Sequence, residues 1–94
     1  MIVKQHRGNG KLILAVCDTE LLGKRFEDSK LVLDLTSSFY KGVEMDENRL
    51  RELTLAAAII NAVGEKTIKF LRDCGFEIKE VNKIKNIPFV NIIF

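Results

Sequence analysis

Hydrophobic residues form nearly continuous runs near the two ends of the chain and fall at helical spacing in its middle. Residues 2–7 predict a first strand. Residues 11–17 predict a second strand, which is apolar almost throughout and is therefore expected to be covered on both faces. Gly8, Asn9 and Gly10 lie between them and accept the positive φ angles that a tight turn requires. The N-terminal segment therefore predicts a β-hairpin.

Shorter elements are predicted next. Residues 18–24 indicate a short helical turn, which Asp18 is expected to cap and Gly23 to end. Residues 31–35 predict a strand after a polar break, and residues 39–42 predict a turn or a short edge strand.

Two helices are predicted in the middle of the chain. The first begins after Asp46, a good N-cap, and continues to Gly64. Its apolar positions recur at three- and four-residue spacing: Leu50, Leu53, Ala57 and Ile60. Beyond Leu55 nearly every residue is apolar, so this half of the helix is expected to be covered on more than one side. The second helix covers residues 65–74 and ends at Gly75.

The C-terminal part predicts two more strands. Residues 76–81 alternate strictly, as a half-buried strand does, and residues 87–94 are strand-like, with Pro88 only at the start. The layout predicts an α/β fold of the α+β type. We expect residues 1–94 to form a single compact domain, in which a mixed β-sheet with an N-terminal hairpin packs against two central helices.

Composition narrows the classes of function only slightly. The net charge of +2 is too small to predict a nucleic-acid partner by itself. The longest apolar stretch, residues 55–63, is about half of a membrane span, and the N-terminus lacks a signal-peptide pattern. Two separated cysteines and a single histidine argue against a zinc site, and no motif implies a cofactor. We therefore expect a cytoplasmic protein with reduced thiols, no metal and no membrane contact.

Candidate chemistry is sparse. Cys17 and Asp18 come where a central strand meets a helical turn, a place where sheets often bind ligands. The favoured interpretation, however, is that Cys17 is a buried small residue and Asp18 a helix cap. His6 is a general base only if an acid or Cys17 lies near it, and is otherwise a surface strand residue. No catalytic residue is assigned.

Scattered basic residues give a second candidate, a nucleic-acid-binding face that includes exposed aromatic residues such as Tyr40. Its proposed contacts are Lys4, Arg7, Lys11, Lys24 and Arg25. The alternative is an ordinary solvated surface, because interspersed charges are normal for a globular protein.

A series of local signatures extends over essentially the whole chain. These are residues 15–18 (AVCD), 20–24 (ELLGK), 39–42 (FYKG), 58–65 (AIINAVGE) and 87–94 (IPFVNIIF). In this order they resemble the small archaeal family known as domain of unknown function 424. The resemblance implies a compact α/β fold and an archaeal cytoplasm, and it suggests a housekeeping role near translation or RNA metabolism. Phe89 departs from the family pattern, which often has a histidine after the proline.

If the corners that carry these signatures converge in space, they outline a ligand pocket. Its candidate residues are Cys17, Asp18, Tyr40, Asn61 and Glu65. Asn61 is a polar residue in an apolar run and is expected to hydrogen-bond to a loop backbone.

The leading hypothesis is a non-enzymatic binding module that contacts RNA or a ribonucleoprotein partner. The alternatives are a small-molecule-binding protein or enzyme that uses this pocket, and a structural subunit that buries its apolar helix against a partner, such as a second copy in a homo-oligomer.

Overall fold

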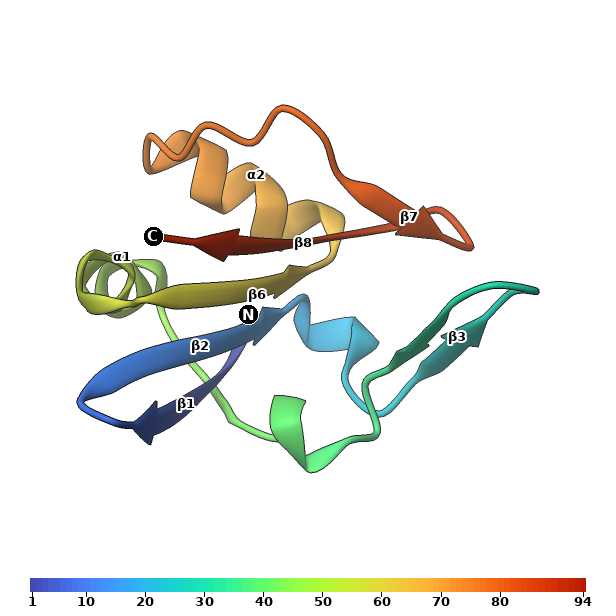
Figure 1. The fold of residues 1–94 in the computed structure, drawn as a ribbon, viewed down its shortest axis with the longest axis horizontal. Helices are drawn as coiled ribbons and strands as arrows, with labels where there is room; N and C mark the ends of the chain where they lie inside the picture. The colour runs from blue at the N-terminus through green and yellow to red at the C-terminus, as the bar shows by residue number, and fades with distance from the viewer.

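The structure is a computed structural model that describes residues 1–94, and its largest element is a mixed six-stranded sheet (Figure 1). In spatial order the strands are β5 (Val43–Glu44), β1 (Ile2–Gly8), β2 (Lys11–Cys17), β6 (Ile59–Val63), β8 (Ile87–Ile93) and β7 (Asn82–Ile84). Only β2 and β6 are parallel, and every other neighbouring pair is antiparallel.

The remaining elements are two helices, a small hairpin and two 3₁₀ turns. The helices are α1 (Glu47–Ala56) and α2 (Glu65–Asp73). The hairpin pairs β3 (Arg25–Glu27) with β4 (Val32–Asp34), and the turns are η1 (Thr19–Leu21) and η2 (Ser38–Tyr40). The predicted fold is confirmed: a compact domain with a mixed sheet, an N-terminal hairpin and two helices.

Both tight hairpins of the large sheet turn on residues with positive φ. Asn9 and Gly10 have φ values of 51° and 73° and join β1 to β2, as predicted. Lys85 and Asn86, with φ values of 50° and 66°, join β7 to β8 in the same way. Positive φ at both central residues matches the right-handed twist of the flanking strands. The second hairpin was not predicted, because Lys-Asn is a weak turn signal.

The first helix is shorter than predicted. Asp46 caps it as expected, since its carboxylate accepts a hydrogen bond from Arg49 N at 2.9 Å. However, α1 ends at Ala56, and the chain becomes extended at Ala57. The prediction that the helix continues to Gly64 is therefore wrong, because residues 59–63 form the central strand β6. A short, mostly apolar run fits a central strand as well as it fits a helix, and the pairing with β2 and β8 decides in favour of the strand.

The prediction of a strand over residues 76–81 is also wrong. This segment is irregular and pairs with no strand, and β7 begins only at Asn82. Instead it packs against α2, where the Ile78 carbonyl accepts hydrogen bonds from Nε and Nη2 of Arg72 at 3.2 and 3.0 Å. Ile78 is buried in the same core as α2. The alternation of polar and apolar residues here reflects packing on a helix.

The sheet has a hydrophobic core on each face. On the helix-side face, α1 and α2 cover a larger core, which includes Leu14, Leu50 and Leu71. On the arm-side face, the β3–β4 hairpin (called the arm below) and the two 3₁₀ turns cover a smaller core with Cys17 and Leu35. Neighbouring residues of β1, β2 and β6 point to opposite faces and so contribute to both cores. In Figure 1 the arm lies beside the carboxyl ends of β2 and β6.

Residues 18–40 only partly follow their predictions. The predicted helical turn is the 3₁₀ turn η1, and Gly23 follows it with a φ of 83°. The predicted strand at residues 31–35 is β4, but its partner β3 was not predicted. The turn of the arm is held by Asp28, whose Oδ1 accepts hydrogen bonds from the backbone of Lys30 and Leu31.

Candidate functional site

Asp18 lies at the carboxyl end of β2 and caps a helix distant in the sequence. Its Oδ1 accepts hydrogen bonds at 2.8 Å from both the backbone N and Oγ1 of Thr67, and its Oδ2 accepts one from Lys66 N at 3.1 Å. Asp18 is only 4 % exposed. The carboxylate thus accepts hydrogen bonds from backbone amides that have no partner within the first turn of α2. Its negative charge also interacts favourably with the positive N-terminal end of that helix. The prediction that Asp18 caps residues 18–24 is wrong, since η1 has no side-chain cap.

Gly64 makes this cap sterically feasible. It connects β6 to α2 with a φ of 108°, and a Cβ built on it would lie 2.3 Å from Cγ of Asp18. Its backbone N donates a hydrogen bond to the Pro88 carbonyl, while Asp18 N donates to Val63 O. A side chain at residue 64 would therefore displace the carboxylate that caps α2.

A shallow pocket of about 250 Å³ adjoins this corner. It is lined by Asp18, Glu20, Leu21, Gly64, Glu65, Lys66, Asn86, Ile87 and Pro88. An exposed ion pair lies on this lining, between Lys66 Nζ and Glu20 Oε1 at 3.0 Å. Of the five predicted pocket residues, only Asp18 and Glu65 line it. The pocket is smaller than most small-molecule sites, which measure roughly 300–1,000 Å³.

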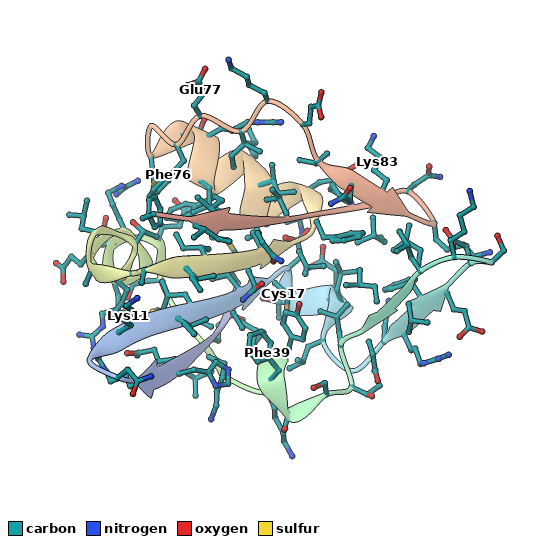
Figure 2. All side chains as sticks on the ribbon, in the orientation of Figure 1. Lys11, Cys17, Phe39, Phe76, Glu77 and Lys83 are labelled. Atoms are coloured by element: carbon teal, nitrogen blue, oxygen red, sulfur yellow. The ribbon has the colours of Figure 1, made fainter.

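Cys17 and Tyr40 lie in the arm-side core. Cys17 is fully buried, and Tyr40 packs against the same cluster (Figure 2 shows Cys17 inside the molecule). Burial, with a smaller contribution from the Asp18 charge, raises the pKa of the Cys17 thiol from 9.0 to about 11. Burial likewise raises the pKa of Tyr40. A thiol with this pKa carries very little nucleophilic thiolate near neutral pH. Cys17 and Cys74 are both free.

Asn61 lies in β6 and not in a helix. Its side chain points to the arm-side face, directly opposite Asn91 of β8. It is half-buried and makes no hydrogen bond within the chain, so the expected bond to a loop backbone does not form. Asn91 is exposed and also has no side-chain partner.

His6 contacts Phe39 and neither Cys17 nor an acid. Its ring stacks on the Phe39 ring with centroids 4.4 Å apart, and Nε2 lies 2.9 Å from the Phe39 carbonyl oxygen. This bond and the stacking fix η2 onto β1. Phe39 also meets Tyr40 edge to face. Sequence patterns did not identify Phe39 as the partner of His6, because the two residues are 33 positions apart.

The five basic residues predicted to bind nucleic acid do not share one surface. Lys4 and Arg7 point to opposite faces of β1, because side chains alternate along a strand. Lys11 begins β2, whereas Lys24 and Arg25 follow η1 beyond the other end of that strand. The seven residues of β2 extend about 20 Å. Arg25 is also paired with Glu27, through Nη2 and Oε2 at 2.7 Å.

Part of the arm-side face is not covered by the arm. The pairing register places two rows of side chains there, across β1, β2, β6 and β8. One row holds Lys4, the buried Ala15, Asn61 and Asn91; the next holds His6, Ile13, Ile59 and Ile93. Phe39 covers His6 in the second row. We call the other exposed and half-buried members of these rows, together with Lys11, the open surface: Lys4, Lys11, Ile13, Ile59, Asn61, Asn91 and Ile93. Ile93 is 74 % exposed.

Charge distinguishes the open surface from the rest of the molecule. The sequences of β1, β2, β6 and β8 contain no aspartate or glutamate, although the chain has 13 acidic residues. The open surface carries the ammonium groups of Lys4 and Lys11. Its strand residues therefore supply positive and neutral groups only.

No group of three or more His, Cys, Asp or Glu side chains is arranged to hold a metal ion. Neither helix is long and apolar enough to cross a membrane. Phe89, at the position where the resemblance leads one to expect histidine, packs against the arm-side core.

Comparison with known proteins gives a family and a fold. The family model described as "Protein of unknown function (DUF424)" matches residues 6–93. The chain is similar to the crystal structure of an uncharacterized conserved protein from Methanopyrus kandleri, with 26 % identity and a TM-score of 0.79. That match covers 97 % of this chain and 88 % of the other. No curated protein matches significantly. The chain therefore belongs to the DUF424 family of proteins of unknown function.

Proposed function

We propose that this protein is a non-enzymatic cytoplasmic binding module that contacts single-stranded RNA, free or within a ribonucleoprotein, through its open surface. The observation that carries the proposal is the composition of that surface. Lysines, unpartnered amides and apolar side chains lie together on four neighbouring strands, β1, β2, β6 and β8, that contain no acidic residue. Ammonium groups bind phosphates, and amides bind the edges of bases.

The alternative, a small-molecule or enzyme site near Cys17 and Asp18, has less support. Cys17 is buried with a raised pKa, and Asp18 already uses its carboxylate to cap α2. The adjoining pocket is small and shallow. The two residues that would have to supply its chemistry are thus occupied in holding the fold together.

The structural-subunit hypothesis loses its original basis. It required a long apolar helix to bury against a partner, and residues 59–63 instead form a central strand of the sheet. Homo-oligomerisation remains a prediction, and light scattering over a range of concentrations would measure it.

Fluorescence anisotropy with a labelled single-stranded RNA of about 12 nucleotides tests the proposal. We expect binding that weakens steeply between about 50 and 200 mM salt, because phosphate contacts release counterions. Lys11→Glu, on the open surface, should weaken binding by about fivefold or more. The matched control is Lys83→Glu, with the same change of charge on the far side of the molecule (Figure 2). Absence of binding at low salt, or equal losses in both variants, would contradict the proposal.

A further inference from the structure

The open surface is chemically asymmetric across the sheet. Its two basic side chains, Lys4 and Lys11, both come from the β1–β2 hairpin. Its amides and most of its isoleucines come from β6 and β8: Ile59, Asn61, Asn91 and Ile93. Since β2 and β6 are neighbours, one ligand lying across the sheet would meet the basic side and the amide side at once.

The pairing geometry brings the two amides close together. Gly64 N donates to Pro88 O, and Phe94 N donates to Ala58 O, so these are hydrogen-bonded pairs of the β6–β8 ladder. Hydrogen-bonded and non-hydrogen-bonded pairs alternate along an antiparallel ladder. Asn61 and Asn91 lie three pairs along the ladder from Gly64 and Pro88, so they form a non-hydrogen-bonded pair. The Cα atoms of such a pair are about 4.5 Å apart, and their side chains are adjacent. Asn61 and Asn91 thus present neighbouring donors and acceptors that no other side chain uses.

We infer that the two sides of the open surface have separate roles in RNA binding, an inference that rests on the proposed function. The β1–β2 side holds phosphates through Lys4 and Lys11. The β6–β8 side contacts the bases. Asn61 and Asn91 hydrogen-bond to base edges, and Ile59 and Ile93 pack against the apolar faces of the bases. Phosphate contacts are independent of sequence, whereas amide contacts depend on the base.

This division restricts the ligand class. The base edges that face Asn61 and Asn91 must be free, and in a duplex the Watson–Crick edges are already paired. Sequence-dependent recognition of RNA generally requires unstacked, single-stranded bases for this reason. The ligand is therefore a single-stranded RNA segment whose backbone lies over the hairpin and whose bases point toward β8.

The test compares two variants on oligoadenylate, oligouridylate and oligocytidylate, each of about 12 nucleotides, and on one RNA duplex. Lys4→Gln combined with Lys11→Gln should weaken binding to all three single strands by a similar factor of about 5 to 10. It should also reduce the slope of log affinity against log salt by about 1.4, since each lost phosphate contact on a single strand removes about 0.7.

Asn91→Ala should change the preference among bases and leave the salt dependence of binding unchanged, in contrast to the double lysine variant. Because Asn91 is exposed, the fold should tolerate this change, which circular dichroism can check. We expect the salt slope to stay unchanged and the affinity differences among the three homopolymers to shrink by about threefold or more. Equal wild-type affinity for all homopolymers, equally tight duplex binding, or a changed salt slope in Asn91→Ala would overturn the division of roles while leaving RNA binding intact. A wild-type protein that binds no RNA would instead remove the proposed function itself.

Discussion

At the scale of single residues, Asp18 and Gly64 are the most tightly constrained by their surroundings. They lie where the ends of β2 and β6 meet the first turn of α2. Asp18 is a buried carboxylate that accepts three hydrogen bonds from the first turn of α2. Gly64 supplies both the backbone conformation and the space that the carboxylate needs. These two residues, 46 positions apart in the sequence, depend on each other sterically.

Replacement of Gly64 should therefore be far more destabilising than replacement of an unconstrained glycine. We expect Gly64→Ala to lower the free energy of unfolding by about 3 kcal/mol or more, because it adds backbone strain and displaces the buried Asp18 carboxylate. Gly8→Ala is the matched control, since a Cβ there meets nothing within 4 Å, and it should change stability by less than about 1 kcal/mol. Urea denaturation measures both values, and similar losses would contradict this role of Gly64.

The raised pKa of Cys17 predicts that the protein loses stability at alkaline pH. Its pKa is 9.0 when unperturbed and about 11 when folded, so its contribution is fully present below pH 9. As the pH rises from about 9 to 11, the unfolded chain releases this proton first, and the free energy of unfolding should fall by about 2 kcal/mol. Above about pH 11 this contribution is constant. In Cys17→Ala, the free energy of unfolding should lack this fall between pH 9 and 11, whereas Cys74→Ser should retain it. If the wild type and both variants showed the same dependence on pH, the fall would not come from Cys17.

At the scale of elements, neighbouring strands decide which apolar runs are helical. Residues 59–63 have an apolar pattern that also suits a helix, yet they lie between β2 and β8 and bond to both. Residues 76–81 have the alternation of a strand, yet no strand lies beside them in register. In both segments, the partner and not the local pattern determines the backbone.

Amide hydrogen exchange should separate these two segments. Amides within residues 60–63 should exchange slowly, because β6 is a central strand paired on both sides. Amides of residues 77–81 should exchange rapidly, because none of them donates a backbone hydrogen bond. Residues 66–71 of α2 provide an internal reference for a protected helix. Protection of residues 77–81 comparable to that of β8 would show that they form a strand.

At the scale of the whole molecule, one sheet joins two cores. Strands β1, β2 and β6 each contribute adjacent residues to opposite faces, such as Ile2 and Val3 in β1. The arm-side core cannot unfold without exposing one face of strands that the helix-side core also requires. This sharing predicts a single cooperative transition.

Two spectroscopic signals can test that cooperativity. Tyr40 is the single tyrosine in a chain without tryptophan, so its fluorescence reports on the arm-side core, and circular dichroism at helical wavelengths reports on α1 and α2. We expect both signals to change at the same urea concentration. Leu35→Ala, in the arm-side core, should shift both midpoints equally and cost about 2–4 kcal/mol. If Tyr40 fluorescence changed at lower urea than the dichroism, the arm would be an independent unit.

The order of the predicted elements along the chain indicated the fold class. Local chemistry was sufficient to determine the N-terminal hairpin with its Asn9–Gly10 turn, the Asp46 cap, and Gly75, which follows α2 with a φ of 99°. Each depends on residues within a few positions of one another, so the physical cause lies within the pattern itself. The family resemblance was likewise carried by short segments.

Tertiary structure alone decided the rest. The role of Asp18 depends on amides 48 and 49 positions away, and the stacking of His6 on Phe39 joins elements 33 positions apart. The predicted pocket residues separate because Cys17 and Tyr40 enter one core while Asn61 turns to the open surface. The open surface itself exists only because β6 enters the sheet beside β2. Sequence patterns record which residues prefer burial, but which surfaces meet depends on the long-range pairing of strands.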